Sequence, residues 1–151
     1  MDTSTEVVLA AFRAVEERDV ERLLELYHDE VEFVDADSLP YGGVLRGKAA
    51  HRRRLLAPGE ASWSGAWAPL QPTPALRRMD PRIVGGNGGE VAVIYRQRAV
   101  SPSGRRFDAP VLGLYEVRDG KLARAQMFHF DTAAVVAFLE HARAEMVDPA
   151  A

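Results

Sequence analysis

The chain begins with apolar positions that recur at helical spacing. Over residues 6–18, Val7, Ala11 and other small apolar residues lie on one side of a helix, and charged residues lie on the other. Asp19 then suits the N-cap of a second helix, in which leucines and an aromatic residue form an apolar stripe over residues 20–27. These patterns predict a helical hairpin.

The next part of the chain has shorter patterns and more breaks. Residues 31–35 alternate between apolar and polar, which predicts a short strand that ends at the loop 37–43, rich in glycine. Residues 46–56 predict a third, short helix. Residues 61–79 hold two tryptophans and three prolines without a clear period, so we expect a long irregular segment of the kind that often forms a binding loop.

Long β-type runs dominate the second half of the chain. The runs 82–85 and 90–100 flank a glycine-rich turn, and the runs 107–118 and 121–131 flank an Asp-Gly turn, so we expect an antiparallel sheet. A helical stripe over residues 132–146 follows. Helices that gather early and strands that gather late are typical of the α+β class.

Length and composition limit the class of protein. The 151 residues suit one domain, 1–151, and 47% hydrophobic residues with a net charge of -3 indicate a globular protein without a nucleic-acid partner. Apolar runs fall short of the roughly 20 residues of a membrane helix and a signal-peptide pattern is missing, so we expect a cytoplasmic protein without membrane association. Zero cysteines and four histidines without ligand spacing predict no metal site.

Two ionisable residues end the last β-type run. His129 and Asp131 are two positions apart and therefore share one face of a strand. The ordinary pKa of histidine, about 6.5, suits proton transfer near neutral pH. Asp131 also directly precedes the final helix, so a catalytic pair and a capping aspartate both stay open. The other histidines, which we interpret as surface or helix-end residues, are His28, His51 and His141.

Three charged residues in β-type runs are further candidates. Asp35 ends the strand 31–35, where burial in an apolar cavity would raise its pKa toward that of a general base, although it also suits a turn cap. Arg96 and Arg98 share a face: inward they would hold a carboxylate or enolate oxygen, and outward they would be solvated. A register shift of one residue would reverse each such assignment. The candidates for substrate binding are Tyr41, Trp63, Trp67, Tyr95, Arg98, Tyr115, Gln126 and Phe128. The two tryptophans would equally suit packing in the core.

Four segments carry a family resemblance. The chain resembles the nuclear transport factor 2-like superfamily through ERDVERL (17–23), YHDEVEFVD (27–35), LRGK (45–48) and YEVRDGKL (115–122). Within that superfamily it is most similar to SnoaL-like polyketide cyclases and ketosteroid isomerase-like proteins. The resemblance implies a cone-shaped α+β barrel, in which a curved antiparallel sheet wraps around the N-terminal helices and a C-terminal helix follows. It also implies an apolar cavity and a homodimer.

The resemblance transfers only part of a catalytic site. Asp35 falls at the position of the catalytic base of the isomerases. Their first-helix tyrosine would fall at Ala11 or Phe12, and the protonated aspartate of their oxyanion hole would fall near Gly113. Both partners are missing from this chain, which counts against steroid isomerisation.

Two other groups suggest further chemistry. The later strands resemble those of limonene-epoxide hydrolases, which carry an Arg-x-Asp pair. Here Arg96 and Arg98 flank a glutamine, so the carboxylate of that pair is missing. Asp131 would still supply one acid. SnoaL-like cyclases use a histidine and an aspartate without cofactor or metal, which His129 and Asp131 resemble. We therefore expect a cofactor-independent cyclase or isomerase that applies acid–base chemistry to a polyketide-like or polycyclic small molecule. A non-catalytic binding protein and an epoxide-opening enzyme stay as alternatives.

Overall fold

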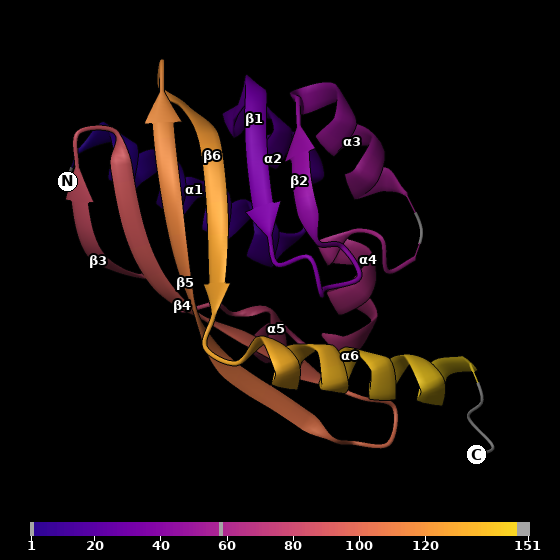
Figure 1. Ribbon diagram of the computed structural model, residues 1–151. Coiled ribbons are helices and arrows are strands. Elements are labelled where there is room, and N and C mark those ends of the chain that lie inside the picture. Colours follow the sequence, from indigo (N-terminus) through magenta and orange to yellow (C-terminus); the bar gives the residue numbers. More distant parts are fainter. Residues whose placement is uncertain (1, 58, 148–151) are drawn as a thin grey trace.

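The computed structural model describes residues 2–57 and 59–147, and it combines one curved sheet with helices at both ends of the chain (Figure 1). This arrangement confirms the predicted α+β class. In chain order the elements are α1 (Thr3–Glu17), α2 (Val20–Leu26), β1 (Tyr27–Asp35), β2 (Gly43–Arg46), α3 (Lys48–Leu56), α4 (Trp63–Trp67), the 3-10 helix η1 (Ala68–Leu70), α5 (Pro74–Arg77), β3 (Arg82–Asn87), β4 (Glu90–Val100), β5 (Arg106–Arg118), β6 (Lys121–His129) and α6 (Thr132–Val147).

The N-terminal helical hairpin forms as its capping residues predict. The Asp19 carboxylate accepts a hydrogen bond from the backbone N–H of Arg22 at 3.0 Å, which confirms Asp19 as the N-cap of α2. Arg18 takes a left-handed conformation (φ 60°), which ends α1 and separates it from α2. The prediction that Tyr27 continues the second helix is wrong. Its backbone is extended, and it pairs with Leu122 of β6 as the first residue of β1.

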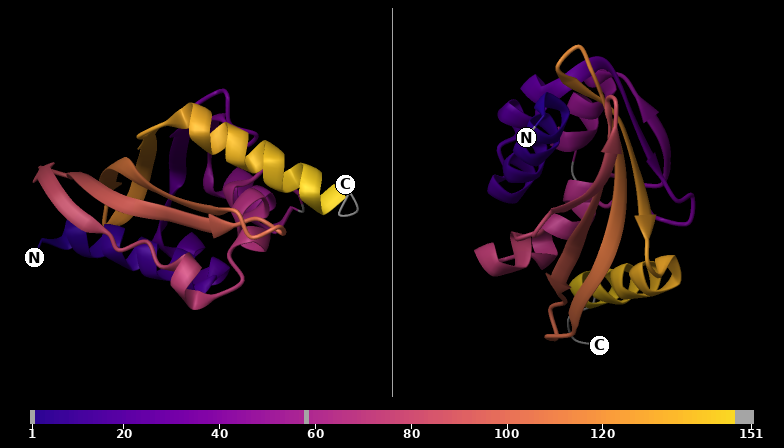
Figure 2. Two further views of the ribbon diagram at one scale, coloured as in Figure 1. Left: turned by 90° about the horizontal axis from the view of Figure 1, so that it is seen from below. Right: turned by 90° about the vertical axis from the view of Figure 1, so that its left-hand side faces the viewer.

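The sheet has six strands in the order β2-β1-β6-β5-β4-β3. The strands of the second half of the chain, β3 to β6, pair antiparallel as expected. β1 and β2 are also antiparallel, whereas β1 and β6 pair in parallel, which the sequence pattern did not predict. After the intervening strands and helices, β6 lies beside β1 and runs in the same direction. The sheet curves strongly (Figure 2) but stays open, since the edge strands β2 and β3 do not pair with each other within residues 2–57 and 59–147.

Two segments contain more regular structure than their sequence patterns predict. Residues 43–46, expected to lie between a loop and a helix, form β2, which pairs with β1 from Asp35↔Gly43 to Glu32↔Arg46. The segment 61–79, expected to be irregular, contains α4, η1 and α5. Two N-cap residues could have predicted helices here. Ser62 caps α4 by accepting a hydrogen bond from Gly65 N–H at 2.9 Å, and Thr73 caps α5 by accepting one from Leu76 N–H at 3.4 Å.

The core consists of two groups of apolar side chains. The larger group joins α1 and α2 to the concave face of the sheet. The smaller group surrounds Trp67, which is completely buried; its ring stacks on Phe138 at a ring-centre distance of 6.1 Å and lies tilted against Phe107 at 5.6 Å. In this way α6 is held across the lower ends of β4 and β5 (Figure 1), and its buried stripe agrees with the predicted one. None of the helices in the described ranges has the length and apolar content needed to cross a membrane.

Candidate functional site

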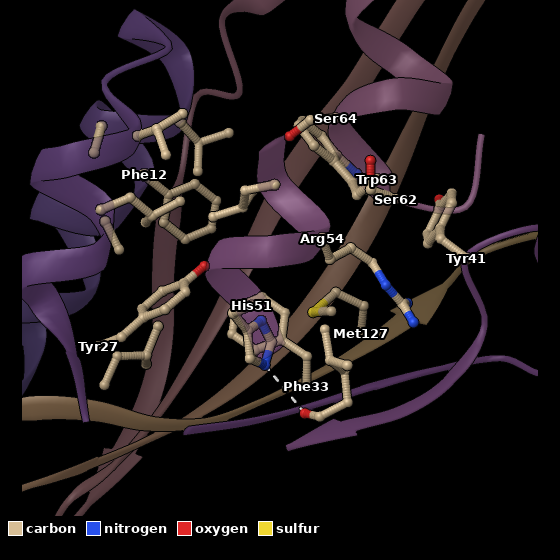
Figure 3. Close-up of a pocket in the computed structure, with 18 of the residues that line it drawn as sticks. Phe12, Tyr27, Phe33, Tyr41, His51, Arg54, Ser62, Trp63, Ser64 and Met127 are labelled. Atoms are coloured by element: carbon tan, nitrogen blue, oxygen red, sulfur yellow. Dashed lines mark hydrogen bonds between the residues drawn. The ribbon is translucent and has the colours of Figure 1, made fainter. Parts of the chain in front are cut away.

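A cavity of about 230 Å³ lies between the concave face of the sheet and helices α1 to α4. Its walls are mainly apolar and aromatic, with Phe12 from α1, Phe33 from β1, Trp63 from α4 and Met127 from β6 (Figure 3). Such a chamber excludes water from most of a small ligand, so each polar group that faces it has a strong electrostatic effect. The polar residues that line the cavity include Asp35, Tyr41, His51, Arg54, Tyr95 and Tyr115.

Asp35 is an acidic residue in the wall of this cavity, and its pKa is strongly raised. It is the last residue of β1, and its side chain is half-buried. Burial raises the pKa of Asp35 from 3.8 to about 6, and the positive charge of Arg54 opposes that rise. Within the described residues its carboxylate has no hydrogen-bond donor and no ion-pair partner. A carboxylate in this condition is available to take a proton from a ligand near neutral pH.

Three tyrosines face the same cavity. Tyr95 and Tyr115 lie on inward-facing positions of β4 and β5, where the strand alternation buries every second side chain, and Tyr41 lies in the loop before β2. Burial raises the pKa of all three phenols, and the negative charge of Asp35 adds to the rise. The hydroxyl groups therefore stay protonated at physiological pH and can donate hydrogen bonds to an oxygen of a ligand.

A glycine determines where the Tyr115 ring lies. The ring leans over Gly113, two residues earlier on the same face of β5, and a Cβ atom at Gly113 would come within 2.5 Å of Cε2 and Oη of Tyr115. No side chain larger than hydrogen fits there while the ring keeps its position. The phenol thus occupies the space above Gly113, where the resemblance to isomerases had marked a missing aspartate.

The two tryptophans have different places. Trp63 lines the cavity directly (Figure 3). Trp67 is fully buried behind the wall, and its Nε1–H donates a hydrogen bond to the Tyr41 hydroxyl oxygen at 2.9 Å. Because that oxygen is already an acceptor, the Tyr41 hydroxyl proton can point toward the cavity. Trp67 therefore orients Tyr41 and does not itself line the cavity.

Helix α3 contributes two residues that the sequence analysis did not select. His51, interpreted above as a surface residue, is only 5% exposed and lines the cavity, so that interpretation is wrong. Its ring packs on Phe33 and Tyr27 at centre distances of 4.8 and 5.5 Å, and its Nε2–H donates to the Leu45 carbonyl at 3.1 Å. Burial lowers the pKa of His51, which favours the neutral ring with an acceptor at Nδ1.

Arg54 is the second of these residues. It lies one helical turn after His51, on the same side of α3, and its side chain extends along the cavity in the direction of Tyr41 (Figure 3). In the sequence, only its three-residue spacing from His51 indicates that Arg54 lies on the same helix face. The arginines at positions 52 and 53 made this residue hard to distinguish from its neighbours.

Arg96 and Arg98 lie on the outward-facing positions of β4. Arg96 forms an ion pair with Asp108 at 2.9 Å, and Arg98 pairs with Asp80 at 2.9 Å and donates to the Arg78 carbonyl. Neither lines the cavity. The inward-facing residues of this strand are instead Tyr95 and its alternate neighbours, because the observed register places the odd-numbered positions against the core.

The end of β6 also lies apart from the cavity. Asp131 is exposed and caps α6 by accepting from Ala134 N–H at 3.0 Å, which agrees with the capping interpretation. Burial lowers the pKa of His129, and its ring nitrogens have no hydrogen-bond partner within the described ranges. Gln126 accepts from Arg124 at 2.9 Å, and Phe128 is 45% exposed on the outer face. None of these four residues lines the cavity that contains Asp35.

Metal ligands are not gathered in the described part of the chain, where no group of three or more histidine, aspartate or glutamate side chains is arranged to hold an ion.

Comparison with solved structures places the fold in a known group. TerC, co-crystallized with polyporic acid, is 24% identical, with a TM-score of 0.74 over 92% of this chain and 99% of that chain. An NTF2-like protein of unknown function from Burkholderia pseudomallei is 16% identical, with a TM-score of 0.72 over 92% and 98% of the two chains. A protein from Xanthomonas campestris described as a polyketide cyclase is 19% identical, with a TM-score of 0.64 over 91% and 96%.

Sequence comparison supplies the family. No curated protein matches the chain significantly, and the structural likenesses at these levels of identity show the fold alone. The family model of the SnoaL-like domain matches residues 8–125, which include most of α1, all of α2 to α5 and most of the sheet. The chain therefore belongs to the SnoaL-like domain family.

Proposed function

We propose that this protein is a cofactor-independent enzyme of the cyclase or isomerase type, which moves a proton on a small aromatic, polyketide-like ketone. One observation carries the proposal: the Asp35 carboxylate, with a pKa raised to about 6, lies in an apolar cavity that three protonated tyrosines share, and it has no partner among the residues that the structure describes. A base with this pKa is effective at neutral pH, where most of it is ionised and its basicity is still high.

In the proposed reaction Asp35 takes a proton from the carbon next to a substrate carbonyl. The electron pair of that C–H bond forms the C=C bond of an enolate, whose oxygen accepts hydrogen bonds from tyrosine hydroxyls. Tyr41 is prepared for this role, because Trp67 already donates to its oxygen. In an isomerisation Asp35 returns the proton to another carbon. In a ring closure the enolate carbon attacks a second carbonyl, and the new alkoxide takes the proton from Asp35.

Some of the similar structures agree with this class of substrate. One is described as a polyketide cyclase, and TerC was co-crystallized with polyporic acid. The epoxide-opening alternative gains nothing from the geometry, because Arg96 and Arg98 face outward and Asp131 caps a helix. A dimer formed through the outer face of the sheet remains part of the proposal, since Leu112 and Phe128 are exposed there.

A proton-exchange assay tests the proposal without knowledge of the natural substrate. The probe is 2-tetralone, a bicyclic ketone with an acidic C–H group, and NMR in D₂O follows its deuteration above the buffer rate. We expect wild-type protein to accelerate exchange and Asp35→Asn to lose at least about 100-fold, the usual contribution of a general base. Asp37→Asn is the matched control, because Asp37 is an exposed aspartate two residues later. Equal exchange by wild type and Asp35→Asn would rule out the proposed base.

A further inference from the structure

Arg54 is a cation in the cavity wall that forms no direct ion pair with any described residue. In the described part of the chain its guanidinium has no ion pair and no hydrogen bond. The other arginines that are only partly exposed each have a partner: Arg18 and Arg77 bind Gln71, Arg96 and Arg98 bind Asp108, and Arg124 binds Glu32. A half-buried guanidinium that keeps five donors unused indicates a place for an anion.

We infer that Arg54 binds a carboxylate of the substrate, and that the cavity accepts aromatic carboxylic acids of one or two rings. This inference rests on the proposed function and names the substrate class of that same site. Arginine suits the role because its planar guanidinium donates two parallel hydrogen bonds to a carboxylate, and the apolar surroundings strengthen them.

The register of α3 against β1 places this anion site beside the proposed base. The His51 ring packs on Phe33, and Asp35 follows Phe33 by two residues on the same face of β1. Arg54 follows His51 by one turn of α3. Asp35 and Arg54 influence each other electrostatically, yet they form no direct ion pair in the described structure, so a ligand group can lie between them.

The size and walls of the cavity define the rest of the ligand. A volume of about 230 Å³ is below the roughly 300–1,000 Å³ of pockets for drug-sized molecules, which favours one or two rings over four. Phe12, Phe33 and Trp63 offer faces and edges against which aromatic rings pack. The neutral His51 ring adds an acceptor at Nδ1 for a hydroxyl group of the ligand.

Paired probes that differ in charge test the inference. The probes are 2-naphthoate and its uncharged relative 2-naphthamide. Binding is measured by calorimetry and by quenching of tryptophan fluorescence, since Trp63 lines the cavity and would contact a bound probe. We expect wild-type protein to prefer naphthoate by at least about tenfold, as charge-assisted hydrogen bonds require. Arg54→Gln should abolish the preference and Arg54→Lys should keep part of it. Arg52→Gln is the matched control, since Arg52 pairs with Glu21 outside the cavity.

Two outcomes would overturn the inference. One is equal affinity of wild-type protein for both probes. The other is a preference that survives Arg54→Gln but disappears in Arg18→Gln, which would move the anion to the other cavity arginine. Asp35→Asn separates this inference from the proposed function. It should keep the preference for naphthoate, because the neighbouring negative charge is gone, while it loses 2-tetralone exchange.

Discussion

Asp35 should reduce the stability of the fold at neutral pH, and replacing it should therefore stabilise the protein. The cause is burial, which raises the pKa of Asp35 from 3.8 in the unfolded chain to about 6 in the folded one. The folded state then binds more protons than the unfolded state between these two pKa values, so stability falls as pH rises from about 4 to about 6. Above that window the cost of the buried charge is complete.

The size of this effect follows from the pKa values. A rise from 3.8 to about 6 corresponds to roughly 3 kcal/mol as an upper estimate. Solvent at the cavity mouth screens part of it, so we expect Asp35→Asn to increase the free energy of unfolding by about 1–3 kcal/mol at pH 7.5. At pH 4 the wild-type carboxyl is mostly protonated in the folded state, and the difference should nearly vanish.

Urea unfolding of wild type and Asp35→Asn at pH 7.5 and pH 4 measures this prediction directly. Asp37→Asn, which removes an exposed charge from the loop just after β1, serves as the control, and it should change stability by no more than about 0.5 kcal/mol at either pH. If Asp35 acted as a turn cap, its replacement would destabilise the protein instead. A loss of stability in Asp35→Asn at pH 7.5, or a gain of equal size at both pH values, would refute the reasoning.

Three further predictions concern the surroundings of this carboxyl group. Replacing Arg54 by Gln removes a positive charge that lowers the pKa of the β1 carboxylate, so the acidic limb of the 2-tetralone exchange profile should move to higher pH. Gly113→Ala should cost about 1–3 kcal/mol in urea unfolding, because its methyl group meets the Tyr115 ring, and shortening Tyr115 to Val should recover most of that cost. Trp67→Phe removes the donor to Tyr41 and should reduce the exchange rate at saturation more than it weakens 2-tetralone binding, whereas an unchanged rate would dismiss the orienting role.

Local elements of the fold follow from local chemistry, which is why the sequence predicts them. Asp19 caps α2 because its short carboxylate reaches a free N–H at any helix start. The turn at Asp119 and Gly120 has positive φ at both residues (55° and 71°), a conformation that glycine and aspartate tolerate. The strand 90–100 alternates between buried and half-buried positions from Val91 to Val100, as expected for a strand with one face on the core.

Short elements were harder to predict, because few residues carry their signal. β2 has four residues and α5 has four, too few for a hydrophobic period to show in the sequence. The parallel pairing of β1 with β6 joins residues about 90 positions apart, such as Val34 and Gln126, and no local pattern predicts such a contact.

The α+β class, the helical hairpin, the long strands and the position of Asp35 at a strand end can all be predicted from local sequence patterns. The side chains that surround that carboxylate follow from the packing of distant segments. That packing turned Arg96 outward and brought His51 and Arg54 inward from a helix whose sequence gives little contrast between its faces. The physical reason is that a strand or helix face is chosen by the layer that packs against it, and that layer comes from distant parts of the chain.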